Sequence, residues 1–162
     1  MFSAANRLSI FVDGNNMFYA QQKNGWFFDP RRVLEYFTKE PELMLINAFW
    51  YTGLKDAQDQ RGFRDALISL GYTVRTKILK EYYDDTSGRY SQKANLDIEI
   101  VVDMFNTVDQ YNRVVLFSGD GDFERAIIPS VEMTVMCVFL DRSNSIARSK
   151  SPSPLNSTTR LY

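Results

Sequence analysis

The chain has 162 residues, the length of about one domain, and its 20 acidic and 19 basic residues give a net charge of −1. It contains no histidine and a single cysteine, Cys137, which excludes histidine-based catalytic triads, zinc sites built on histidine or several cysteines, and intrachain disulfides. Any catalytic chemistry therefore depends on carboxylates, Lys, Tyr, Ser or Thr, or on a cofactor. Carboxylates prefer hard cations such as Mg²⁺ or Mn²⁺.

The first half of the chain alternates strand and helix patterns. The apolar run at residues 8–12 predicts a buried strand that ends at Asp13, and a helix follows within residues 15–22. Asp29 followed by Pro30 marks the start of a helix over residues 30–38. Further along, we expect a strand over residues 43–51 and a helix over residues 56–70 that stops at Gly71. A strand over residues 72–79 and a polar loop over residues 81–89 should follow.

The second half begins with the clearest helical pattern, over residues 92–108, whose predicted apolar face contains Ala94, Ile98, Val101, Met104 and Phe105. A buried strand at 113–117, a helix at 123–128 and a strand at 134–140 follow. Strands that alternate with helices predict a parallel α/β sheet covered on both faces. Residues 143–162 are rich in Ser, Pro and Thr, so we expect a tail after one domain over residues 1–142.

The hydropathy of the chain, its N-terminal residues and its net charge bear on its cellular location and on its binding partners. No apolar run reaches the roughly 18 residues of a membrane span, and residues 1–7 lack the apolar core of a signal peptide, so we expect a cytoplasmic protein with no membrane contact. The near-neutral charge gives no global attraction for nucleic acid, so such binding would need a local basic patch.

Two acidic groups directly follow predicted strands. Asp13 follows the first strand, and Asp120 and Asp122 follow the strand at 113–117, each beside glycines that let the backbone turn tightly. Ligands of open parallel sheets bind beyond the carboxyl ends of the strands, so these carboxylates are expected at one ligand site. The alternative is that the Asp and Gly residues only form turns and cap helices.

Asp97 is a third acidic candidate. It shares a helical face with Ile100, Val101 and Met104, which predicts a carboxylate directed toward the core, whereas Glu99 and Asp103 are expected to point the other way. A carboxylate in that position needs a metal, a helix cap or an Arg partner. Carboxylates that converge at one sheet edge repel each other, and divalent cations both relieve the repulsion and activate water against a phosphodiester.

The order of these segments resembles the NYN domain family, the LabA-like branch of the PIN-like nucleases. The resemblance covers roughly residues 7–141 and rests on FVDGNN at 11–16, on the Leu-Asp helix that reaches Met104, and on LFSGDGDF at 116–123. It implies a PIN-like three-layer α/β/α sandwich with a central, mainly parallel five-stranded sheet, and an Mg²⁺- or Mn²⁺-dependent endoribonuclease activity. The sequence departs from the family after residue 141, where members commonly continue into a further helix and this chain shows no convincing helical pattern.

Carried over residue by residue, the resemblance implies that the catalytic and metal-binding carboxylates are Asp13, Asp97, Asp120 and Asp122. Asp103 matches a further acidic position, but its predicted helix face argues against metal contact, and Glu124 is a weaker candidate. Substrate contacts are expected from Asn16, Lys93, Ser118 and Arg89. In the loop at 81–89 and just beyond it, tyrosines alternate with basic residues, a pattern typical of base stacking on single-stranded RNA and equally of a solvated loop.

Other functions remain open on the sequence alone. A non-catalytic RNA-binding or regulatory module would keep the acidic pocket without turnover, and a homodimer is compatible with the sequence. A haloacid-dehalogenase-type phosphatase is suggested by the strand-Asp-Gly start, but Asn15 occupies the position where that mechanism requires a second acid. A Toprim-like site rests only on the Asp120-x-Asp122 spacing.

Overall fold

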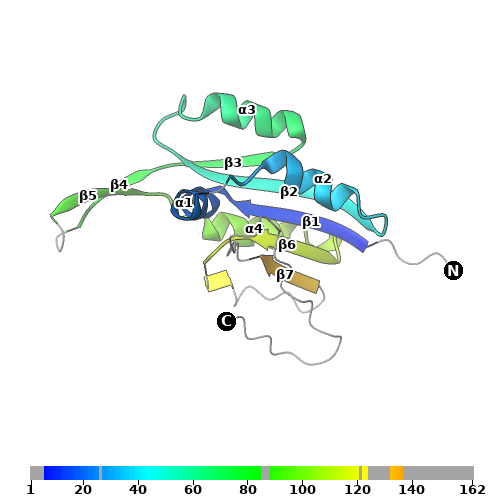
Figure 1. Cartoon of the computed structure of the whole chain (residues 1–162). Coiled ribbons are helices and arrows are strands. Elements are labelled where there is room, and N and C mark those ends of the chain that lie inside the picture. Colours follow the sequence, from blue (N-terminus) through cyan, green and yellow to red (C-terminus); the bar gives the residue numbers. More distant parts are fainter. Residues whose placement is uncertain (1–5, 26, 85–87, 121, 124–131, 137–162) are drawn as a thin grey trace.

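The computed structural model describes residues 6–25, 27–84, 88–120, 122–123 and 132–136 (Figure 1). Five strands form its main sheet in the order β3-β2-β1-β6-β7, and every neighbouring pair is parallel. They are β1 (Asn6–Asp13), β2 (Leu43–Leu54), β3 (Thr73–Ile78), β6 (Arg113–Phe117) and β7 (Glu132–Met136). The predicted parallel five-stranded sheet is therefore confirmed.

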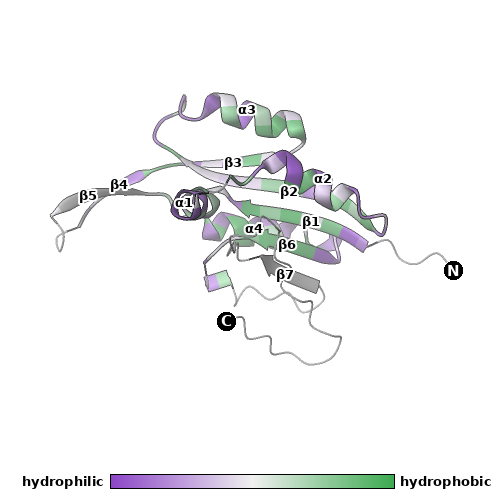
Figure 2. Cartoon of the chain, viewed as in Figure 1, coloured by the Kyte–Doolittle hydropathy of each residue, from purple (hydrophilic) through white to green (hydrophobic). Residues whose placement is uncertain are grey.

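Helices cover both faces of this sheet, because side chains of a strand alternate between its two faces. On one face, Leu8, Ile10 and Val12 of β1 share a core with α1 (Gly14–Asn24), α2 (Pro30–Thr38) and α3 (Arg61–Leu70). On the other face, Phe11 shares a core with α4 (Asp97–Asn106), which a short 3₁₀ turn, η1 (Val108–Gln110), follows. Figure 2 shows that most of β1 and β6 is apolar. The three-layer α/β/α arrangement is thus confirmed.

Several helix ends follow the predicted local chemistry. α2 begins at Pro30, and the Asp29 carboxylate caps it by accepting hydrogen bonds from the backbone N–H groups of Arg31 and Arg32 at 2.9 and 3.4 Å. α3 ends at Leu70, and Gly71 adopts φ 102°, a left-handed conformation that glycine reaches without steric cost.

The start of α3 differs from the prediction. The helix was expected from residue 56 but begins at Arg61. The Asp56 carboxylate instead accepts hydrogen bonds from the backbone N–H groups of Gln58 and Asp59, at 2.8 and 3.0 Å, and forms a local turn. Such side-chain bonds offer the backbone an alternative to helix.

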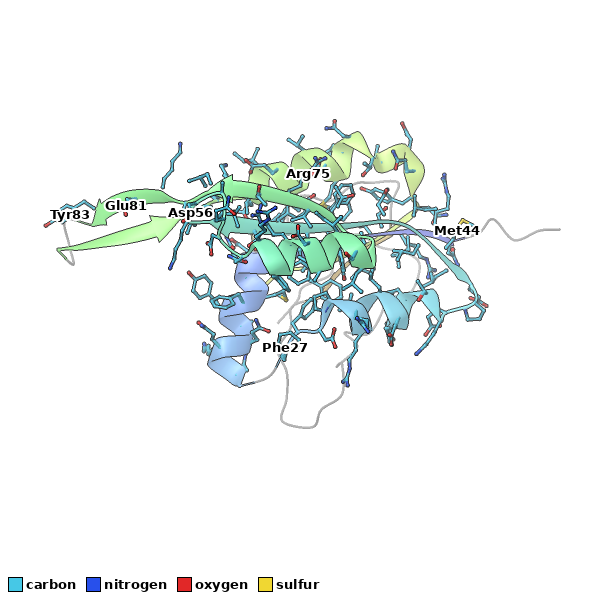
Figure 3. All side chains as sticks on the ribbon, turned by 90° about the horizontal axis from the view of Figure 1, so that it is seen from above. Phe27, Met44, Asp56, Arg75, Glu81 and Tyr83 are labelled. Carbon is cyan, nitrogen blue, oxygen red and sulfur yellow. The ribbon has the colours of Figure 1, made fainter. Side chains whose placement is uncertain are left out.

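The polar segment predicted as a loop is a β-hairpin, so that prediction was wrong. β4 (Lys80–Asp84) and β5 (Arg89–Lys93) pair antiparallel, and only Leu79 separates them from the end of β3. The hairpin extends away from the main sheet (Figure 1). Figure 3 shows Tyr83 farther out along it than Glu81.

The hairpin also corrects the helix predicted over residues 92–108. Gln92 and Lys93 pair with Glu81 and Lys80, and α4 begins only at Asp97, so Lys93 belongs to a strand rather than to the turn before Asp97. The side chains of Arg89 and Lys93 lie outside the described part of the chain. So do Glu124, most of the predicted helix at 123–128, and the predicted tail at 143–162.

Candidate metal centre

Asp13 lies where β1 meets α1. It is the last residue of β1 and caps α1, and its side chain is buried with only 7% of the residue exposed. Its Oδ1 accepts a hydrogen bond from the backbone N–H of Asn16 at 3.0 Å, and its Oδ2 accepts one from the Ser118 hydroxyl at 3.3 Å. Because residues of β1 alternate between faces, Asp13 lies on the same face as Phe11, the face that α4 covers.

The turn after β6 brings two more carboxylates to the same edge. Ser118 is fully buried, and its hydroxyl oxygen accepts a hydrogen bond from the Asp120 backbone N–H at 3.2 Å. The Asp120 carboxylate in turn accepts one from the Asp122 backbone N–H at 2.9 Å. These bonds fold the turn so that Asp120 is half-buried and Asp122 is exposed.

Two consecutive asparagines connect the β1–α1 turn to both neighbouring strands. The Asn15 side-chain oxygen accepts a hydrogen bond from the Gly53 backbone N–H of β2, and that of Asn16 accepts one from the Gly119 backbone N–H after β6, both at 3.0 Å. Asn16 and Ser118, expected to contact substrate, therefore organise the carboxylates in this structure. The role of Asn15 was missed, although the double asparagine after Asp13-Gly14 was its visible signal.

Asp97, the first residue of α4, completes the acidic group. It is half-buried, and its backbone N–H donates to the Asn95 side-chain oxygen at 2.9 Å. It lies on the same helix as Ile100 and Met104, which are almost fully buried, as expected. The predicted apolar face was wrong at Ile98 and Phe105, which are 71% and 51% exposed.

Electrostatic interactions link the four carboxylates, which are Asp13, Asp97, Asp120 and Asp122. Burial raises the pKa of Asp13 above its ordinary value, the charges of Asp97 and Asp120 raise it further, and hydrogen bonds from Asn16 and Ser118 oppose the rise. Burial likewise raises the pKa of Asp97, as do the charges of Asp120, Asp122 and Glu99, against a hydrogen bond with Asn95. Among the described side chains, none of the four forms an ion pair with Lys or Arg.

The donor chemistry of this group fits a hard divalent cation, because every side-chain donor is an oxygen and the carboxylates repel each other. Their spacing is wider than an assembled centre requires. Within the described residues, no three acidic, His or Cys side chains gather closely enough to hold one metal ion. A cation would therefore have to draw these carboxylates together, and Asp97, half-buried, and Asp122, exposed, are more open to solvent than Asp13.

Glu99 and Asp103 were expected to point away from the sheet, and this prediction was wrong. Asp103 accepts two hydrogen bonds from Arg75 of β3, at 2.9 and 3.1 Å, and a third from the Tyr51 hydroxyl of β2 at 2.9 Å. Glu99 accepts one from Lys77 of β3 at 2.6 Å. Both carboxylates therefore attach α4 to the sheet. The phenol of Tyr51 is buried beside Asp103, and both effects raise its pKa.

The family follows from a comparison with known proteins. The model of the NYN domain matches residues 7–149, so the chain belongs to the NYN domain family, a family of PIN-like nucleases. Low amplitude and bright protein LabA of Synechococcus elongatus is 78% identical over 123 residues, which cover 75% of this chain and 66%, just under two thirds, of that protein.

A solved structure gives a similar fold. It is the crystal structure of a protein of unknown function from Vibrio parahaemolyticus, with 26% sequence identity and a TM-score of 0.64, and the match covers 83% of each chain. The resemblance found in the sequence is thus confirmed. No helix in the described ranges is long and apolar enough to cross a membrane.

Proposed function

We propose that the chain is a divalent-cation-dependent endoribonuclease that hydrolyses single-stranded RNA. In this proposal Asp13, Asp97, Asp120 and Asp122 bind Mg²⁺ or Mn²⁺ at the carboxyl edge of the parallel sheet. The observation that carries the proposal is that these carboxylates interact electrostatically with no basic partner among the described side chains. Burial first, and the charges of neighbouring carboxylates after it, raise the pKa of Asp13 and Asp97. The membership in a nuclease family supports the same chemistry.

The residues of the chain divide the work of such a centre. Asp13 is held by a hydrogen bond at each oxygen, so its carboxylate is fixed in place. Each oxygen keeps a further lone pair that could bind a cation. Asp120 is fixed through the Asp122 backbone, whereas the exposed Asp122 side chain is free to orient water or accept its proton. When bound, a divalent cation lowers the pKa of a coordinated water and stabilises charge on the phosphodiester.

A second candidate function is RNA binding without turnover. It is favoured by one observation, the absence of any three metal-binding side chains gathered together among the described residues. It leaves the same carboxylates at the sheet edge but needs no closure around an ion. Contacts from Arg89 and Lys93, a homodimer and a cytoplasmic location stay predictions under either function.

Cleavage of labelled RNA distinguishes the two functions. We expect the purified chain to cleave single-stranded RNA in the presence of Mn²⁺, and the Asp13→Asn and Asp120→Asn variants to lose this activity. The matched control is Asp65→Asn, which removes an exposed carboxylate from α3 and should leave cleavage unchanged. Duplex RNA and single-stranded DNA of the same sequence test the substrate class.

The outcomes separate cleanly. Wild-type protein that binds RNA but cleaves no substrate with Mg²⁺ or Mn²⁺ supports the non-catalytic module and overturns the nuclease proposal. Equal cleavage by wild type and Asp13→Asn would show that the activity comes from elsewhere.

A further inference from the structure

Lys77 of β3 contacts the chain on both sides of Asp97. Its Nζ donates one hydrogen bond to the backbone carbonyl of Asn95 at 2.9 Å and one to Oε1 of Glu99 at 2.6 Å. Asp97 lies midway between these two contacts, two residues from each. One side chain on the neighbouring layer therefore fixes both the approach to α4 and its first turn.

The Asn95 contact matters because α4 has no conventional cap. Leu96, at the cap position, makes no side-chain hydrogen bond, and the first backbone N–H of the helix is instead accepted by the Asn95 side chain. Since Lys77 holds the carbonyl of Asn95, it also holds the residue that orients the Asp97 backbone. A shift of Asn95 would rotate or displace Asp97 relative to Asp13.

The energetics of the Lys77–Glu99 pair favour an orienting role over a stabilising one. Both side chains are more than a third exposed, at 38% and 39%, and solvent screens ion pairs of this kind, so they contribute little to stability. Glu99 also keeps its second oxygen, Oε2, buried without a hydrogen-bond partner. A buried oxygen without a hydrogen-bond partner carries an energetic cost. In Glu99 this oxygen belongs to the same carboxylate whose other oxygen, Oε1, is held by Lys77.

A second ion pair on the same helix provides an internal comparison. Arg75 binds Asp103 through two hydrogen bonds, six residues beyond Asp97 or about 9 Å along the helix at 1.5 Å per residue. This pair docks the middle of α4 on β3 (Figure 3 labels Arg75). Among the described side chains, this pair forms no hydrogen bond or ion pair with residues 95–99, although the charge of Asp103 acts on Glu99.

We propose that Lys77 is a positioning residue that sets the place of Asp97 at the candidate metal centre. Its relevance to catalysis rests on the proposed function, whereas its effect on the start of α4 does not. Neither the acidic motifs nor the family match assigns Lys77 a role. It acts through Asn95 and Glu99 and touches neither substrate nor metal in this proposal.

The experiment compares three variants of the full chain. Lys77→Met keeps the length of the side chain but removes its charge and its donors, Lys77→Arg retains both, and Arg75→Met breaks the other ion pair. Mn²⁺ binding to metal-free protein is measured by titration calorimetry. We expect Lys77→Met to weaken binding about tenfold, as loss of outer-shell partners commonly does, and the other two variants to stay within about threefold of wild type.

A second measurement needs no metal. Amide NMR spectra of the metal-free proteins should show the signals of residues 95–97 shifted in Lys77→Met and close to wild type in Arg75→Met. If wild type binds no Mn²⁺, the proposed function fails, and these shifts alone decide whether Lys77 positions Asp97. Unshifted signals, wild-type Mn²⁺ affinity in Lys77→Met, or equal loss in Arg75→Met would each overturn the inference, the last because it points to general docking of α4.

Discussion

Gly14 provides the sharpest test of how α1 is seated against the sheet. A Cβ atom at this position would lie 2.3 Å from Nε1 of Trp50 and 2.5 Å from the backbone carbonyl oxygen of Tyr51, both in β2. The backbone oxygen cannot move aside as a flexible side chain can, so Gly14→Ala must push the start of α1 away from β2. That displacement also strains the hydrogen bond between Asn15 and Gly53.

The magnitude follows from opposing effects. Overpacking costs about 1–3 kcal/mol, a weakened hydrogen bond about 1 kcal/mol, and the higher helix propensity of Ala returns up to about 1 kcal/mol. We expect Gly14→Ala to lower the free energy of unfolding by about 1–4 kcal/mol. The matched control is Gly62→Ala in the first turn of α3, where a Cβ meets nothing within 4 Å, and which should gain about 0.5–1 kcal/mol.

Urea unfolding followed by circular dichroism measures both changes under the same conditions. Opposite signs for the two glycines are the expected result. A Gly14→Ala variant as stable as wild type would show that the close approach of α1 to β2 is absent in solution, and with it the stated reason for glycine at the start of α1.

Three further predictions address the acids and α4. Because the pKa of Asp13 is raised, the folded state keeps the Asp13 proton at pH values above the ordinary pKa of 3.8. The stability of wild type relative to Asp13→Asn should therefore fall as the pH rises from 3.8 through the pKa of the folded state. Urea unfolding in EDTA at several pH values measures this difference, and parallel pH profiles of the two proteins would contradict the prediction. Tyr51→Phe removes a hydrogen bond to Asp103 and should lower the free energy of unfolding, measured by urea unfolding, by about 1 kcal/mol. Met104 is buried and Phe105 is exposed, so Met104→Ala should lower the free energy of unfolding by about 2–5 kcal/mol and Phe105→Ala by less than about 0.5 kcal/mol. Equal losses of stability would contradict the assigned buried face of α4.

The sequence carries enough local information to predict the strands of the main sheet and its carboxyl edge. Short apolar runs followed closely by Asp and Gly residues define β1 and β6, and the Asp29-Pro30 pair defines the start of α2, because these signals act within a few residues. Asp13 and Asp120 could therefore be assigned to one edge before the structure was known.

Features that depend on distant partners could not be predicted in this way. The helical spacing of α4 does not show that β3 presents Arg75 and Lys77 to its acidic residues, so Glu99 and Asp103 were assigned to the wrong face. The hairpin was missed because its polar, turn-rich composition hides the alternation of its strands, and pairing across it sets where α4 begins. Sequence spacing describes one helix by itself, whereas its neighbours decide which polar residues turn inward.

The hydrogen bonds around Asp13 join residues that are far apart in the sequence and are therefore synthesised at different times. Ser118 and Asp13 are separated by 105 residues, and Asn16 and Gly119 by 103 residues. A nascent chain emerges from its N-terminus, so β1, α1 and the acidic end of β1 leave the ribosome long before their partners. The carboxylate edge consequently cannot form until β6 and the turn after it have been synthesised. Under the proposed function, a nascent chain that ends before the turn after β6 could not cleave RNA.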